Sequence, residues 1–246
     1  MLELHPWIRR GRDTNALDQD TFSLAVNRSI ALGFAAFNSY GPRHVRWGHN
    51  DAGGDWAQDG SVRQIAWLRV DVAQDAPGQR IPLQPAIAVL GDSLDRVGRF
   101  RPTGLHALVP VGVSPDARAD LASMADWFAL ADPAGQVRFT VTLAGAGPVE
   151  RQPDASRVLT AAREAGHGQL AIEPSEAPAS TPSLAPPLVG QLFLPGRLST
   201  IAFTCTAHEW SLDLMSWVAE VFVEAARAAG TTAPTLVTVS LDDPSG

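Results

Sequence analysis

Hydrophobic and polar residues alternate along five segments of the chain, a pattern typical of strands with one buried face. These segments are 64–72, 104–113, 136–143, 198–207 and 235–241. In 136–143, Val137, Phe139, Val141 and Leu143 share one side, and Gln, Arg and Thr residues share the other. Weaker strand patterns occupy 85–90, 169–172 and 190–194. Because strands of parallel sheets are apolar on both sides, we predict a mainly antiparallel sheet.

A repeat of apolar residues every 3.6 positions predicts four helices. They span 21–38, 114–130, 154–165 and about 209–229. The last has the clearest apolar stripe, which runs from Trp210 through Leu214 and Trp217 to Val221, and Gly230 supplies its C-terminal stop.

For the other helices, fewer residues indicate the N-terminus and the apolar side. Ser114 is a suitable N-cap for 114–130, with Pro115 in the first helical position. The predicted buried residues of that helix are Leu121, Met124, Ala125 and Phe128. Helix 21–38 is expected to bury a stripe made of Phe22, Val26, Ile30, Phe34 and Phe37.

These elements predict an α+β fold, with helices packed on one face of the antiparallel sheet or sheets. Their order suggests that an α-β-β-β-α-β unit occurs twice, so we expect an N-terminal half at 1–148 and a C-terminal half at 149–246, together forming one compact unit. The duplication is a hypothesis from element order, and whether the halves share one sheet stays open. Residues 174–187 contain five prolines and are expected to form an extended loop.

Composition excludes several kinds of site. The 246 residues include a single cysteine, Cys205, so neither an intrachain disulfide nor a thiolate zinc or iron–sulfur site can form in one chain. His44, His49, Asp51 and Asp55 could supply metal ligands, but their spacing matches no metal motif, and we expect no metal and no cofactor. No stretch approaches the roughly 20 apolar residues of a membrane-spanning helix, and Met1–Trp7 lacks the pattern of a signal peptide. The expected location is the cytoplasm.

The charge distribution limits the partners that the chain can bind. All 19 basic residues are Arg, so catalysis by a lysine amine is excluded. The net charge is −7, of which residues 149–246 contribute −6 (5 Arg against 11 Asp and Glu). A nucleic-acid binder usually carries a basic stripe. We therefore expect neither a nucleic acid nor a membrane as the partner.

Candidate chemistry concentrates in segment 43–59, which combines histidines, aspartates and tryptophans with the pair Gly53-Gly54. The candidates are His44, Trp47, His49, Asp51, Asp55 and Trp56. His49 and Asp51 could act as an acid–base pair, and Trp47 and Trp56 could form the walls of a ligand pocket, with His44 and Asp55 contributing contacts. The alternative is a surface loop whose tryptophans attach it to the core.

Two further histidines are candidates outside that segment. His208 follows the strand that ends at Ala207, and would lie on the polar side as a general base or simply beside a helix start. His106 lies on the polar side of its own strand and could face His208 if two sheets stack. Cys205 lies on an apolar side, where a buried thiol is inert.

Two functions remain open. In the first, the chain is a non-catalytic binding or accessory protein that uses an α+β sheet surface to bind a protein partner. In the second, it is an enzyme that acts on a small molecule in a pocket between the two halves, with His49 or His208 as the general base. A homo-oligomer is compatible with both.

Overall fold

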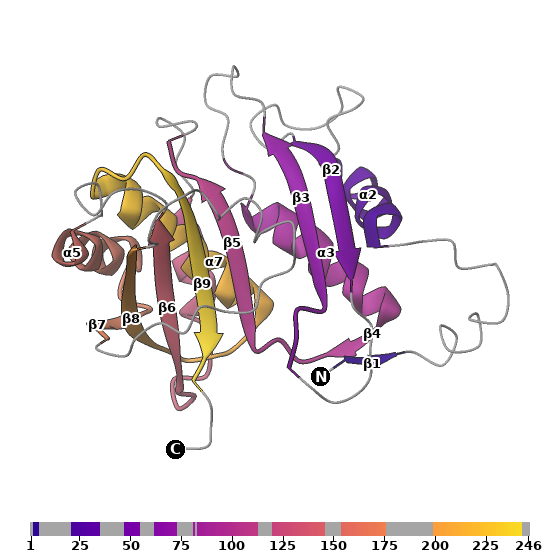
Figure 1. The fold of residues 1–246 in the computed structure, drawn as a ribbon. Coiled ribbons are helices and arrows are strands. Elements are labelled where there is room, and N and C mark those ends of the chain that lie inside the picture. Colours follow the sequence, from indigo (N-terminus) through magenta and orange to yellow (C-terminus); the bar gives the residue numbers. More distant parts are fainter. Residues whose placement is uncertain are drawn as a thin grey trace, which may run out of the picture. The chain divides into compact units, whose positions relative to one another are not determined.

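The computed structural model describes residues 2–4, 21–34, 47–54, 62–72, 81, 83–112, 120–145, 154–175 and 199–242 (Figure 1). The chain divides into two compact units. Unit 1 comprises Met1–Pro102 with Ser183–Ala185, and unit 2 comprises Thr103–Pro182 with Pro186–Gly246. The boundary that the sequence suggests at 148–149 stays a prediction.

Unit 2 contains a five-stranded antiparallel sheet, as the alternating pattern predicts. The strands are β5 (Gly104–Pro110), β6 (Val137–Gly145), β7 (Ala171–Pro174), β8 (Ser199–Ala207) and β9 (Pro234–Leu241). Their order in the sheet is β5-β9-β6-β8-β7, and every neighbouring pair is antiparallel. The sheet therefore combines strands from both sides of residue 148. The predicted duplication stays a hypothesis, and the predicted strand at 190–194 lies outside the described residues.

Helices cover one face of this sheet. They are α4 (Leu121–Phe128), α5 (Ala155–Ala165) and α7 (Leu212–Ala228), and Figure 1 shows α7 crossing behind the strands. Phe203 of β8 and Phe222 of α7 lie with ring centroids 5.3 Å apart, and both are fully buried. Phe128 of α4 packs on Trp217 of α7, centroid to centroid 4.9 Å. The predicted apolar sides of the strands are the sides that face these helices.

Capping residues set where these helices start. Asp154 accepts a hydrogen bond from the backbone N–H of Ser156, and Ser211 accepts one from Leu214. The predicted start of helix 114–130 at Ser114 is wrong, because α4 begins at Leu121 with Asp120 as its cap. Ser114 and Pro115 lie outside the described residues. An aspartate nearer the apolar stripe provides the cap instead.

The described residues of unit 1 form two small antiparallel sheets and two helices. Strand β1 (Leu2–Leu4) pairs with β4 (Gly98–Phe100), and β2 (Trp47–Gly54) pairs with β3 (Ala66–Val72). The helices α2 (Thr21–Ala31) and α3 (Leu83–Val97) pack on the β2–β3 pair. Ala25, Trp47 and Val89 form a buried cluster from α2, β2 and α3.

Several predictions for unit 1 are wrong. Segment 43–59, for which a surface loop was the alternative, contains strand β2, and the predicted strand at 85–90 lies within α3. The pair Gly91-Asp92, whose residue types favour a turn, is also helical. Asp92 pairs with Arg28 of α2, and the Ser93 hydroxyl donates to the Val89 carbonyl at 2.7 Å. Here packing between two helices prevails over the local preference of Gly and Asp for turns.

The buried side of α2 also differs from the prediction. Thr21, Ala25 and Ser29 are buried, whereas Ile30 is 60% exposed. A helix packed closely on a hairpin places small residues at the contact, so its largest apolar side chains need not mark the buried side. Phe37 lies outside the described residues, as do residues 176–187 of the proline-rich segment.

The assignment of the two sheet faces predicts unequal costs for neighbouring residues on β8. We expect Phe203→Ala to lower the free energy of unfolding by about 3–5 kcal/mol, because it opens a cavity against α7. Thr204→Ala, one residue along on the other face, is expected to cost less than about 1 kcal/mol. Urea unfolding of both variants measures the difference, and equal costs would contradict the face assignment.

Candidate functional site

The side of the five-stranded sheet that points away from the helices is rich in hydroxyl groups, and we refer to it as the polar face. Neighbouring residues on each strand point to opposite faces, so the register fixes its members. Its polar members are His106, Arg138, Thr140, Thr142, Glu173, Thr200, Thr204, Thr206, Thr238 and Ser240. The same register also places the apolar residues Leu108, Ala144, Ala202 and Leu236 on this face. All five strands contribute backbone to this face.

The register arranges these side chains in rows that cross the strands. One row runs from His106 through Thr238 to Thr142, and the next runs from Ser240 through Thr140 and Thr204 to Glu173. His106 Nδ1 lies 3.0 Å from the Thr238 hydroxyl. Side chains opposite each other on paired strands are close enough to interact, so each row is a continuous line of polar groups.

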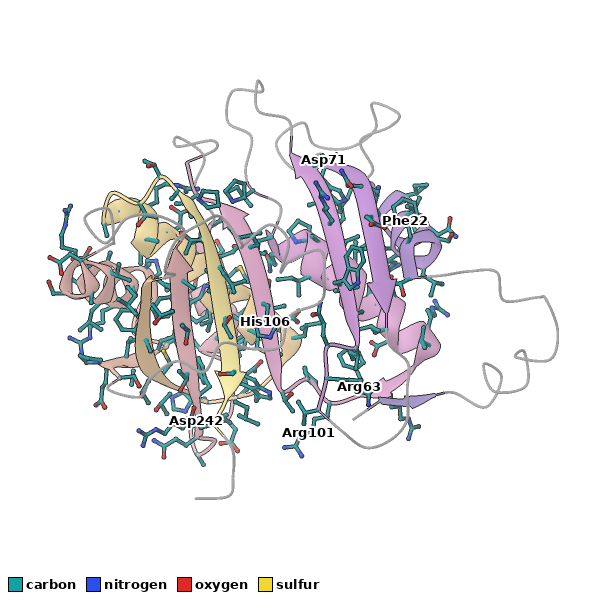
Figure 2. All side chains as sticks on the ribbon, in the orientation of Figure 1. Phe22, Arg63, Asp71, Arg101, His106 and Asp242 are labelled. Atoms are coloured by element: carbon teal, nitrogen blue, oxygen red, sulfur yellow. The ribbon has the colours of Figure 1, made fainter. Side chains whose placement is uncertain are left out.

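Asp242 lies at one end of the polar face, next to Thr140 and Arg138 (Figure 2). The Thr140 hydroxyl donates to Asp242 Oδ1 at 2.7 Å, and Arg138 Nε lies 3.4 Å from Asp242 Oδ2. The Arg138 side chain is 70% exposed and the Asp242 side chain 35% exposed. This end of the face is therefore open to solvent. Thr238, two rows further along β9, is 7% exposed, and Leu236 in the next row is 3% exposed.

The composition of the polar face determines its chemistry. A hydroxyl can both donate and accept, so the threonines can bond to either kind of group on a ligand. Burial lowers the pKa of His106, so its imidazole is neutral near pH 7. Among the described residues, no group of three or more His, Cys, Asp or Glu side chains could hold a metal ion. The arrangement is suited to hydrogen bonding over a broad surface.

His49 and Trp47 lie in the core of unit 1. His49 is 6% exposed and Trp47 1% exposed. His49 Nε2 lies 2.7 Å from the Ser29 hydroxyl of α2 and 3.4 Å from the Trp47 indole nitrogen, and Phe22 packs edge-on to the imidazole. Burial lowers the pKa of His49. These contacts join the β2–β3 pair to α2.

The structure does not bring His49 and Asp51 together. The pairing register shifts between them, and Asp51 lies exposed opposite Arg69 of β3, while His49 points into the core. The Asp51 carboxylate accepts from the backbone N–H of Ala52 at 2.9 Å. His44, Asp55 and Trp56 lie outside the described residues.

His106 and His208 are also far apart. Three strand spacings separate β5 from β8, about 14 Å, and His208 lies six residues beyond Ala202, which shares a row with His106, adding roughly 20 Å along the strand. His208 is exposed, and its Nδ1 lies 2.8 Å from the Gly135 carbonyl. Cys205 is fully buried, and burial raises the pKa of its thiol, as expected for an inert side chain.

Sequence reasoning missed Asp242 and Arg138 as neighbours. Asp242 follows strand 235–241 on the same side as Thr238 and Ser240, so its parity alone could have placed it on the polar face. Its pairing with Arg138 depends on β9 lying beside β6, a long-range contact that alternation along one strand does not predict.

The comparisons add no relative. The chain matches no protein-family model, no curated protein and no solved structure. Within the described ranges, none of the helices is long and apolar enough to cross a membrane.

Burial of His49 predicts that acid destabilises the protein. The folded-state pKa of His49 lies below its unfolded value near 6.5, so the unfolded state binds the proton more tightly. The contribution to stability is complete above pH 6.5 and is lost as the pH falls through 6.5 toward the folded pKa. Urea unfolding between pH 7.5 and 5 measures this loss, which we expect to be smaller in His49→Gln.

His106→Gln is the matched control, because burial also lowers the pKa of that histidine in unit 2. Each substitution should reduce the acid-induced loss of unfolding free energy by the share that its own histidine contributes. An unchanged pH dependence in His49→Gln would show that protonation of His49 is not opposed by its surroundings.

Proposed function

We propose that this chain is a cytoplasmic, non-catalytic binding protein that recognises a protein partner through the polar face of its five-stranded sheet. The observation that carries the proposal is the set of polar rows on the face opposite the helices. These rows are half-buried at Thr140, Thr204 and Thr206 and open at Arg138 and Asp242.

The size of the polar face supports a macromolecular partner. Five strands at about 4.8 Å spacing span roughly 19 Å. Four of them have seven to nine residues and extend about 23–30 Å, whereas β7 has four residues. Protein interfaces typically bury about 800 Å² on each partner, with an arginine among the enriched residues and a polar rim. Ala144, Leu236 and Thr238 are buried, so the end of the face toward Arg138 and Asp242 is the part that can contribute to such an interface.

The charge of the polar face supports a partner that binds mainly by hydrogen bonds. Arg138 is offset by Asp242, and Glu173 leaves one net negative charge at the β7 side. A nucleic acid would need several unopposed cations. Threonine hydroxyls can pair with backbone amides and with polar side chains of a protein surface. The alternative function, an enzyme with a pocket between two halves, stays a prediction.

The test compares proteins captured from the source cells by three tagged full-length forms. In the double variant Thr204→Arg/Thr206→Arg, two large cations would stand on the polar face, and we expect at least a tenfold loss of the proteins that wild type captures. Thr160→Arg, on the exposed side of α5, is the matched control and should capture them like wild type. Quantitative mass spectrometry provides the readout, with circular dichroism to check folding.

Equal capture by all three forms would overturn the proposal. So would equal loss in the double variant and in Thr160→Arg, because a loss that does not depend on position reflects added charge and not the polar face.

A further inference from the structure

The outer edge of β5 carries backbone groups that point away from the sheet. In register, Pro110 of β5 lies opposite Pro234 of β9, and neither residue has an N–H, so they form a non-bonded pair. At the other end, the backbone N–H of Leu241 donates to the Thr103 carbonyl at 2.9 Å. Bonded and non-bonded pairs alternate in an antiparallel ladder. Leu105, Ala107 and Val109 therefore bond to β9, and Gly104, His106 and Leu108 direct their N–H and C=O groups outward.

No strand among the described residues pairs with this outer edge. Gly104 is exposed, and His106 and Leu108 are partly exposed. Three N–H donors and three carbonyl acceptors thus stand in a row, repeated every second residue. This spacing is the complement of another extended backbone and of no compact ligand.

The opposite edge of the same sheet is protected. The same alternation directs the Ile172 carbonyl of β7 outward, and Arg163 of α5 donates to it from Nε at 3.0 Å and from Nη2 at 2.7 Å. Pro174, the next outward residue, has no N–H to offer. β7 has four residues. Short length, proline and a covering arginine are devices by which proteins block an edge strand.

β5 has none of these devices among the described residues. It is seven residues long, and its sequence Gly-Leu-His-Ala-Leu-Val-Pro contains no Asp, Glu or Arg. Its proline is at the last position, where it removes one outward donor but leaves three others. An uncharged edge strand of this length is a template for pairing with another chain.

We propose that β5 binds an extended segment of a protein partner, which adds to the sheet as a sixth strand. The added backbone would bond to Gly104, His106 and Leu108. Its side chains would lie alternately beside Leu105, Ala107 and Val109 on the helix side and beside His106 and Leu108 on the other side. A segment that fits is free of proline, is rich in β-branched and aromatic residues, and carries no charge on its helix side. This proposal needs the edge of the sheet and does not depend on the polar face.

Leu108→Pro tests the edge directly. It removes an outward N–H and places a ring where the new strand would lie, but it removes no bond to β9, and proline is tolerated on edge strands. Leu108→Ala is the matched control, since it shortens the side chain and keeps the N–H. The probe is a library of random nine-residue peptides displayed on phage, selected on the full-length wild-type chain.

We expect the selected peptides to be uncharged strand formers that bind Leu108→Pro at least about tenfold more weakly than wild type, and Leu108→Ala nearly as well as wild type. No enrichment of peptides, or equal binding to Leu108→Pro, would overturn the proposal.

If Leu108→Pro does not fold, amide hydrogen exchange in the wild-type chain tests the proposal instead. In the free wild-type chain, the amides of Gly104, His106 and Leu108 should exchange quickly, and a saturating peptide should slow them while leaving Thr160 unchanged. Slow exchange in the free chain at every concentration would mean that the edge is already covered and would overturn the proposal. Protection that appears only as the chain dimerises would assign the edge to a second copy and would overturn it too.

The two proposals can fail separately. Cellular proteins lost in Leu108→Pro but retained by Thr204→Arg/Thr206→Arg would support strand addition and overturn the polar face. Cellular proteins retained by Leu108→Pro but lost in Thr204→Arg/Thr206→Arg, together with peptides that bind Leu108→Pro as well as wild type, would support the polar face and overturn strand addition.

Discussion

The packing of α7 on the strands of unit 2 is the constraint on which the rest of the structure depends. This helix buries residues around its whole circumference, from Leu214 through Trp217 and Phe222 to Ala226. Phe203 of β8 is fixed against it, and so the apolar side of every strand in the sheet is fixed as well. A shift of one residue in register would turn the polar rows toward the helices. Because the apolar side of every strand packs on the helices, the polar side chains of the same strands lie on the opposite face.

The parts of the fold that were predictable are those in which local pattern and long-range packing agree. Segments such as 136–143 and 198–207 alternate cleanly and become β6 and β8, and the stripe on α7 is equally clear. In unit 1 the two disagree. Strand β2 is built from Trp47, His49 and small or acidic residues whose pairing shifts at a bulge, so its period is broken. Its place in the fold depends on contacts with α2, which no local pattern reveals.

The same distinction between local pattern and long-range packing applies to the candidate site. The sequence placed His106 and the threonines on a polar side, since alternation along one strand decides that. It could not decide which strands are neighbours, and so it missed the Thr140–Asp242–Arg138 contacts. It joined His49 to Asp51 because they are close in sequence. A buried histidine bonded to Ser29 is instead explained as a connection between a hairpin and a helix.

The order of strands also explains why the two edges of the sheet differ. β7 is next to α5 in sequence, and the short connection allows Arg163 to reach back to the outward carbonyl of Ile172. β5 is the first strand of unit 2, and no helix of that unit precedes it in the chain. Selection against aggregation would favour a charged residue or an internal proline at such an edge. The proposed pairing with a partner strand would account for the run of uncharged residues from Gly104 to Val109.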